Sequence, residues 1–268
     1  CWLSVFYVSI FSRSRWVISY ASHFGRKEIL PNNIGTIILH ERPQDEIPFL
    51  YNEELAKYIH YHDTWKTSLN IERNTLQYPG KILSKFDINF DDLILGIHPG
   101  CSASQKFRRW PIDNFITIAK RFCNEFNGKV LIFGGPEEEL EIFNIQHKLQ
   151  DVQACAVTSL PIRESSALIK RCSIFLTNDS GLMHISQAVG VPTVAIYGPT
   201  KPEKFDSIYA NSYFIRLRGN VSCAPCLGTK RIKECGTNVP NCITAVTVDH
   251  VYTAIKKHIN TYYKSTER

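Results

Sequence analysis

The sequence predicts an α/β protein whose main domain is a doubly wound, mostly parallel β-sheet covered by helices on both faces. From about residue 93 onward, short apolar runs alternate with amphipathic segments of roughly 10–15 residues, which is the pattern of βαβ units. Right-handed crossovers place the helices on both faces of such a sheet. The 268 residues correspond to about 1.8 domains at ~150 residues each, so this domain leaves room for part of a second one.

The first part of the chain is less regular than the rest. The expected elements are a helix at Trp2–Phe11, a strand at Trp16–Tyr20 and a helical segment at Glu46–His60. The strand is predicted from its β-branched and aromatic residues, and the helical segment from its apolar spacing. A turn signal at Pro79-Gly80 lies in a polar stretch, so we expect a linker near residues 80–92.

The regular part contains six predicted strands and five predicted helices. The strands are short apolar runs bounded by turn residues. They are expected at Leu93–Ile97, Val130–Phe133, Ala154–Val157, Ile174–Leu176, Pro192–Tyr197 and Tyr213–Leu217. The helices are expected at Pro111–Phe126, Glu137–Leu149, Pro161–Arg171, Gly181–Val189 and Val248–Tyr262.

Composition excludes several classes of protein. Hydrophobic residues make up 44% and charged residues 21% of the chain, so it can bury a core and need not be disordered. No apolar run approaches the ~20 residues of a membrane-spanning helix. The net charge of +6 permits an anionic ligand or peripheral contact with an anionic membrane. No nucleic-acid-binding motif is present, so nucleic acid is not an expected partner.

The loops after the strands are expected to carry the chemistry, because ligands of open α/β sheets bind at the carboxyl ends of the strands. Four loops contain small, phosphate-compatible or basic residues, at 98–111, 134–139, 177–184 and 197–202. Neither a G-x-G-x-x-G nor a G-x-x-x-x-G-K-[ST] pattern occurs, which disfavours a standard dinucleotide or NTPase site.

The loop at residues 178–181 leads directly into a helix. Asp179 or Ser180 can cap the free backbone N–H groups of the first turn, and the same N–H groups can instead bind a phosphate. Gly181 permits close approach of a ligand to the backbone, and His184 follows Ser180 by one turn. An ordinary helix cap followed by a core histidine is the alternative to a phosphate site.

The other loops also have two interpretations each. Lys106, Arg108 and Arg109 precede a helix start, where cations oppose the helix dipole; an anion nearby explains them, and a solvated basic loop is the alternative. Glu138 follows two glycines and either accepts hydrogen bonds from ribose hydroxyls or complements the helix dipole. Thr200 either contacts a phosphate or lies in a simple turn.

The order HPGCS, RRWP, FGGPEE, NDSGLMH and YGPTKP resembles glycosyltransferase family 9, the ADP-heptose:lipopolysaccharide heptosyltransferases. The resemblance runs from about Leu93 to the last helix. It implies a GT-B architecture of two facing Rossmann-like domains. Residues 86–268 would be the complete C-terminal domain that binds the nucleotide-sugar donor, and residues 1–85 would be part of the acceptor domain and a linker.

The resemblance also implies a reaction and a set of site residues. An acceptor hydroxyl of the lipopolysaccharide inner core would attack the anomeric carbon of ADP-heptose with inversion, without cofactor or divalent metal. The protein would then be cytoplasmic, with peripheral contact at the inner membrane. The implied donor-binding residues are Lys106, Arg108, Arg109, Glu138, Asp179, Ser180, Gly181, His184 and Thr200.

The chain departs from the family pattern at its front. The family has a general base, an Asp, in an early loop of the N-terminal domain, and a sugar hydroxyl needs such a base. No residue here matches that motif, so none is assigned. The chain begins at Cys1 in an apolar stretch, and we expect it to be an N-terminally truncated member. A nucleotide-sugar-binding half-protein without turnover, or a GT-B enzyme that uses a UDP-sugar, are the alternative functions.

Four cysteines lie close together near the end of the sequence. They are Cys223, Cys226, Cys235 and Cys242. Such thiols suit a tetrahedral zinc ion, although the second pair is spaced more widely than in a standard zinc ribbon. Disulfide or redox pairing and free thiols in a packed loop are the alternatives.

Overall fold

The computed structural model describes two compact units of the chain. By contacts between Cα atoms, one unit contains residues 1–65 and 203–206, and the other contains residues 66–202 and 207–268. The described residues are 16–20, 35–39, 78–89, 91–201, 213–227, 229, 235 and 240–263. In the first two of these ranges only the backbone is described.

The first unit contributes a pair of parallel strands, β1 (Trp16–Tyr20) and β2 (Gly35–Leu39), with Trp16 opposite Gly35. Strand β1 confirms the strand predicted at the same residues, whereas β2 was not predicted. The predicted helices Trp2–Phe11 and Glu46–His60 lie outside the described residues.

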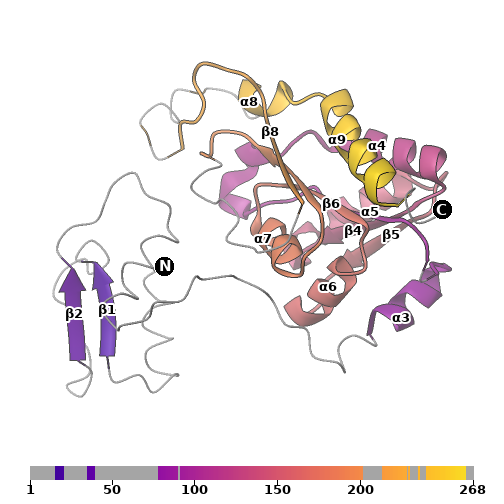
Figure 1. Ribbon diagram of the computed structural model, residues 1–268, viewed down its shortest axis with the longest axis horizontal. Helices are drawn as coiled ribbons and strands as arrows, with labels where there is room; N and C mark the ends of the chain where they lie inside the picture. Colours follow the sequence, from indigo (N-terminus) through magenta and orange to yellow (C-terminus); the bar gives the residue numbers. More distant parts are fainter. Residues whose placement is uncertain are drawn as a thin grey trace. The chain divides into compact units, whose positions relative to one another are not determined.

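The second unit is built on a six-stranded sheet in which every neighbouring pair is parallel (Figure 1). The strands are β3 (Ile94–His98), β4 (Lys129–Gly134), β5 (Ala154–Thr158), β6 (Ile174–Asn178), β7 (Thr193–Tyr197) and β8 (Phe214–Arg218). Their order is β5-β4-β3-β6-β7-β8. The chain therefore builds the sheet outward in one direction from β3 and then outward in the other from β6, which makes the β3/β6 boundary the topological switch point.

Helices cover both faces of this sheet. On one face pack α4 (Ile112–Phe126), α5 (Glu139–Lys148), α8 (Asn241–Thr244) and α9 (Val248–Tyr262). On the other face pack α3 (Tyr78–Leu83), α6 (Ile162–Ile169) and α7 (Gly181–Ala188). The predicted doubly wound α/β domain is thus confirmed, and the helices and strands predicted between residues 93 and 262 differ from those of the structure by at most two residues at either end.

Strand β3 shows why both faces are apolar. Leu95 and Ile97 belong to the core under α4 and α9, whereas Ile94 belongs to the core under α6. Alternate side chains of a strand point to opposite faces, so a central parallel strand reads as a continuous apolar run. Between them, Gly96 leaves space for Phe175 and Cys172, because a Cβ at this position would collide with both side chains.

The prediction of a linker near residues 80–92 is wrong for residues 80–86, which are helical. Residues Tyr78–Leu83 form α3, followed by a 3-10 helix, η3, at Ser84–Phe86. Leu83 and Ile88 are 4% exposed and pack in the core beneath α6. The Pro79-Gly80 pair lies at the start of the helix, where proline is tolerated because its N–H would have no helical partner.

Two further 3-10 helices and one short helix were not predicted. They are η4 (Ala103–Arg108), η5 (Pro136–Glu138) and α8. Each is a short turn in a loop, with no apolar periodicity long enough to reveal it. Within the described residues, no helix has the length and apolar character that crossing a bilayer demands.

Candidate functional site

A cavity of about 1190 Å³ lies at the carboxyl ends of β3 and β6, in the second unit. It is located at the topological switch point, where open α/β sheets bind ligands. Its lining includes His98, Lys106, Arg109, Glu138, Ser180 and Gly181. Leu140 and Ile162, which also line it, are 83% and 56% exposed. The cavity therefore joins charged groups to an apolar rim.

The N-terminus of α7 opens onto this cavity. Ser180 is the N-cap residue and has extended backbone angles, but its side chain caps no backbone N–H of α7. Its hydroxyl instead lies 3.0 Å from His98 Nδ1 and 3.0 Å from Thr177 Oγ1. The first-turn N–H groups have no helical partner of their own. This end of α7 therefore offers donors and a positive dipole to an anion.

Asn178, at the end of β6, forms hydrogen bonds with the loop that follows β3. Its Nδ2 donates to the carbonyl oxygens of Pro99 at 2.7 Å and Gly100 at 3.3 Å, and its Oδ1 accepts from the N–H of Trp110 at 3.0 Å. Trp110 is fully buried, and its Nε1 donates to the carbonyl of Val246 at 2.8 Å. The loop after β3 is thus fixed to the end of β6 by buried hydrogen bonds.

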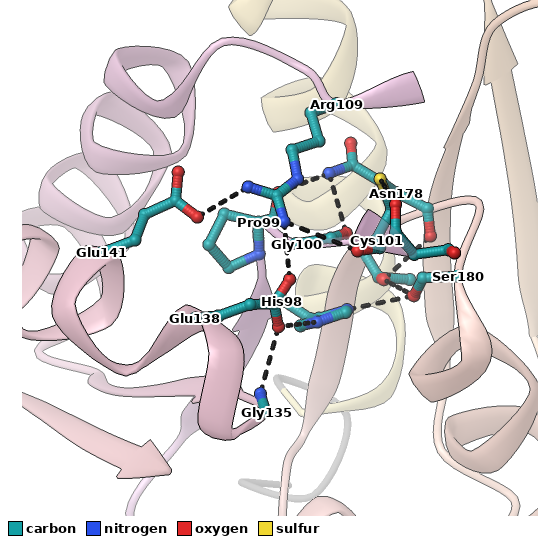
Figure 2. Close-up of polar contacts among 12 residues, drawn as sticks. His98, Pro99, Gly100, Cys101, Arg109, Gly135, Glu138, Glu141, Asn178 and Ser180 are labelled. Carbon is teal, nitrogen blue, oxygen red and sulfur yellow. Dashed lines mark hydrogen bonds and ion pairs between the residues drawn. The ribbon is translucent and has the colours of Figure 1, made fainter. Parts of the chain in front are cut away.

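Glu138 is the centre of a polar network (Figure 2). One carboxylate oxygen lies 3.3 Å from His98 Nε2 and accepts from the N–H of Gly135 at 3.0 Å, and the other pairs with Arg109 at 2.8 Å. Arg109 also pairs with Glu141 at 2.7 Å. Burial acts to raise the pKa of Glu138, but the hydrogen bonds and the nearby positive charges outweigh it, so the pKa is lowered.

Gly100 is required for this arrangement. A Cβ added at this position would overlap the carboxylate of Glu138. The backbone after β3 therefore approaches Glu138 as closely as glycine alone permits.

Arg108 and Asp179 form a second, separate ion pair. Arg108 Nη1 lies 3.0 Å from Asp179 Oδ2, and the two side chains are 12% and 5% exposed. Arg108 Nε is buried and has no hydrogen-bond partner in the described part of the chain. Thr200, which follows β7 and is 1% exposed, likewise has a hydroxyl without a partner among the described residues. Buried donors without acceptors are uncommon in proteins and need an explanation.

His184 lies on the second turn of α7. Burial lowers its pKa, against the opposing influence of Asp179. The neutral form is therefore favoured more strongly than for a solvent-exposed histidine.

The structure brings most of the predicted donor residues together. Lys106, Arg109, Glu138, Ser180 and Gly181 line the cavity. The other four, Arg108, Asp179, His184 and Thr200, are not among its lining residues, and the predicted role of each of the nine in binding the donor stays a prediction.

The sequence reasoning missed His98, Asn178 and Glu141. His98 belongs to the His-Pro-Gly-Cys-Ser motif directly after an apolar run, and its position at the strand end was the available signal. For Asn178 and Glu141, the partners at Pro99 and Arg109 are 79 and 32 residues away, a distance that local patterns do not reveal.

The four late cysteines lie near enough to one another for Cys223, Cys226 and Cys235 to act on the thiol of Cys242. Burial first, and then the neighbouring thiols Cys226, Cys223 and Cys235, raise the pKa of Cys242 to about 11. Across the residues with described positions, no group of three or more His, Cys, Asp or Glu side chains is arranged to hold a metal ion. Zinc binding by the four thiols stays a prediction.

Comparison with protein families gives a match to glycosyltransferase family 9 (heptosyltransferase) over residues 55–236. Lipooligosaccharide heptosyltransferase 2 of Campylobacter jejuni (strain 81116) is 29% identical over 212 residues, which are 76% of this chain and 64% of that protein. Lipopolysaccharide heptosyltransferase 2 of Salmonella typhimurium is 30% identical over 138 residues, 50% of this chain and 39% of that protein. The chain thus spans less than two thirds of either relative.

Solved structures have a similar fold. The family 9 glycosyltransferase of Veillonella parvula matches with a TM-score of 0.69 and 20% identity, over 85% of this chain and 64% of that one. The Escherichia coli ADP-heptose heptosyltransferase II matches with a TM-score of 0.57 and 20% identity, over 72% of this chain and 54% of that one. Because the family match covers more than half of the chain, the chain belongs to glycosyltransferase family 9.

Proposed function

We propose that the second unit binds ADP-heptose in the cavity at the ends of β3 and β6, and that the protein transfers the heptose to an acceptor in the lipopolysaccharide inner core. The observation that carries this proposal is the N-terminus of α7, which has no side-chain cap and opens onto a cavity lined by Lys106 and Arg109. Dipole, N–H donors and cations together suit a diphosphate. The names of the relatives, lipopolysaccharide and lipooligosaccharide heptosyltransferases, supply the sugar and the acceptor.

The chemistry follows from where negative charge develops. When the acceptor hydroxyl attacks the anomeric carbon, the bond to the diphosphate breaks and ADP carries away the electron pair. The hydroxyl gives its proton to a general base, to which no residue is assigned. Preformed donors that face the leaving oxygen stabilise this charge without reorganisation. The N–H groups of Gly181 and its neighbours, with the cations Lys106 and Arg109 that line the cavity, supply such donors. Arg108 Nε and the Thr200 hydroxyl lack partners among the described residues, but neither residue lines the cavity, so their contact with the diphosphate stays a prediction.

The acceptor and its location form the finer part of the proposal. An inner-core acceptor is attached to a lipid, so the protein would work from the cytoplasm at the face of the inner membrane. The net charge of +6 favours contact with anionic lipids. Sedimentation with vesicles containing phosphatidylglycerol, compared with phosphatidylcholine vesicles, tests this contact; equal binding to both would contradict it.

Calorimetric titration of the purified chain with ADP and with UDP tests the donor assignment. We expect ADP to bind more tightly than UDP. A preference for UDP would contradict the heptosyltransferase assignment and favour a GT-B enzyme that uses a UDP-sugar. ADP binding without transfer to a lipopolysaccharide acceptor would identify the chain as a donor-binding part alone.

Two lysines provide a matched pair of variants. Lys106 lines the cavity, whereas Lys120 lies on the exposed side of α4 and pairs with Asp151. Lys106→Ala is expected to weaken ADP binding by about tenfold, the scale of one charge-assisted hydrogen bond. Lys120→Ala is expected to leave ADP affinity unchanged. Equal effects of the two substitutions would remove Lys106 from the site.

A further inference from the structure

We propose that His98 couples binding of the donor diphosphate to proton uptake, by controlling which group accepts a hydrogen bond from the Ser180 hydroxyl. This inference rests on the proposed function, because it places the diphosphate at the N-terminus of α7. His98 is a positioning residue in this proposal. It acts through Ser180 and is 5% exposed at the end of β3.

One nitrogen of His98 has its proton fixed by its partner. Nε2 lies 3.3 Å from a carboxylate oxygen of Glu138 (Figure 2). An ionised carboxylate only accepts hydrogen bonds, and Glu138 is kept ionised by Arg109 at 2.8 Å and the N–H of Gly135 at 3.0 Å. Nε2 therefore carries a hydrogen in both charge states of the ring.

The other nitrogen changes its role with the charge of the ring. In the neutral ring Nδ1 is an acceptor, so the single hydrogen of the Ser180 hydroxyl, 3.0 Å away, points to His98. In the imidazolium ring Nδ1 carries a hydrogen and donates it to Ser180 Oγ. The Ser180 hydroxyl then no longer donates to His98, and it can donate its hydrogen bond to Thr177 Oγ1 at 3.0 Å or to a ligand.

A bound diphosphate favours the second state for two reasons. Its oxygens accept the released Ser180 hydrogen, and its negative charge attracts the positive ring. The proton comes from solvent and ends on Nδ1, while Ser180 keeps its own hydrogen and only turns it toward the ligand.

Other charges around His98 act on the same equilibrium. The carboxylates of Glu138 and Asp179 favour the charged ring, whereas the cations of the basic loop disfavour it. The titratable and charged side chains that line the same cavity as His98 are Cys101, Lys106, Arg109, Glu137, Glu138 and Glu141. Asp179 precedes Ser180 and pairs with Arg108, and it acts in turn on His184 of α7.

Calorimetry measures the number of protons directly. ADP is titrated into the full chain at pH 7 in buffers with different ionisation enthalpies, and the slope of the observed enthalpy against the buffer enthalpy is the number of protons taken up. The phosphate of ADP contributes its own protons equally to every variant, so the difference between wild type and variant isolates the histidine. The variants are His98→Asn, His184→Asn and, as a control on the exposed surface of α9, His250→Asn.

We expect wild type and His250→Asn to take up the same fraction of a proton, and His98→Asn to take up less. Ser180→Ala retains the imidazole ring but removes the hydroxyl that exchanges partners, so it should also reduce proton uptake. This variant replaces His98→Asn in the test if thermal unfolding shows that His98→Asn does not fold. Uptake unchanged in both variants, or lost only in His184→Asn, would overturn the inference while leaving the proposed function intact. No binding of ADP to the wild type would overturn both.

Discussion

Replacing Arg108 by alanine separates the two roles that this side chain has in the site. In the free protein Arg108 pairs with Asp179 at 3.0 Å, and the aspartate is only 5% exposed. Removing one partner of a buried pair leaves the other charge without compensation, at a cost of ~3–5 kcal/mol. Because Arg108 itself is 12% exposed and water can reach the vacated space, we expect the lower end of this range, about 3 kcal/mol of the free energy of unfolding.

The effect on ligand binding has a different origin. A charge-assisted hydrogen bond from Arg108 to the diphosphate contributes ~1.5–3 kcal/mol, so Arg108→Ala should weaken ADP binding by roughly 10- to 150-fold. Adding Asp179→Asn removes the uncompensated charge. The double variant should therefore regain much of its stability in urea unfolding, but none of the affinity that depends on the arginine.

Urea unfolding and ADP calorimetry on wild type, both single variants and the double variant complete the test. ADP affinity that is unchanged in Arg108→Ala would refute the placement of the diphosphate beside Arg108. Affinity that returns in the double variant together with stability would show that the loss came from unfolding of the loop, and not from a lost contact with the ligand.

Two further substitutions test the fold and the polar network. Gly96→Ala should destabilise the protein by ~1–3 kcal/mol in urea unfolding, because the new Cβ would lie 2.8 Å from the sulfur of Cys172 and closer still to the ring of Phe175; Gly80→Ala in α3, where the same atom meets nothing within 4 Å, is the control and should not destabilise. Glu138→Gln should be less stable than wild type at pH 7. Since folding lowers the pKa of Glu138, the carboxylate contributes stability above its unfolded pKa of ~4.3, and the difference should shrink as the pH falls through the folded pKa; a difference that grows toward pH 3 would contradict this sign.

The fold of the second unit was largely accessible from sequence because its signals are local. A central strand such as β3 shows as an unbroken apolar run, and α4 shows five buried side chains on one face: Phe115, Ile116, Ile118, Ala119 and Phe122. Helix α3 was missed because it is short and begins with Pro79-Gly80, a pair that more often marks a turn. Its position is determined by packing of Leu83 beneath α6, which no local pattern reports.

The candidate site could be predicted only in part, because local patterns do not report contacts between distant residues. The motifs identified which loops carry polar residues, and parallel strand order explained why these loops meet at one edge. Which side chains pair at this edge of the sheet depends on residues that are far apart in the sequence, such as His98 and Ser180, which are 82 residues apart. Glu138 illustrates the limit: it was predicted as a ribose contact, yet both of its carboxylate oxygens already hold partners within the protein.

The position of β6 beside β3 has a consequence for biosynthesis. As the chain leaves the ribosome, β3, β4 and β5 emerge first, and one edge of β3 lacks its neighbour until residues 174–178 follow. An open apolar strand edge attracts other chains, so nascent chains that stop in this interval are exposed to aggregation and to chaperones. Closure of that edge also delivers Asn178 and Ser180 to the loops after β3. The step that closes the open edge of β3 is therefore the same step that brings together the loops around the ligand cavity.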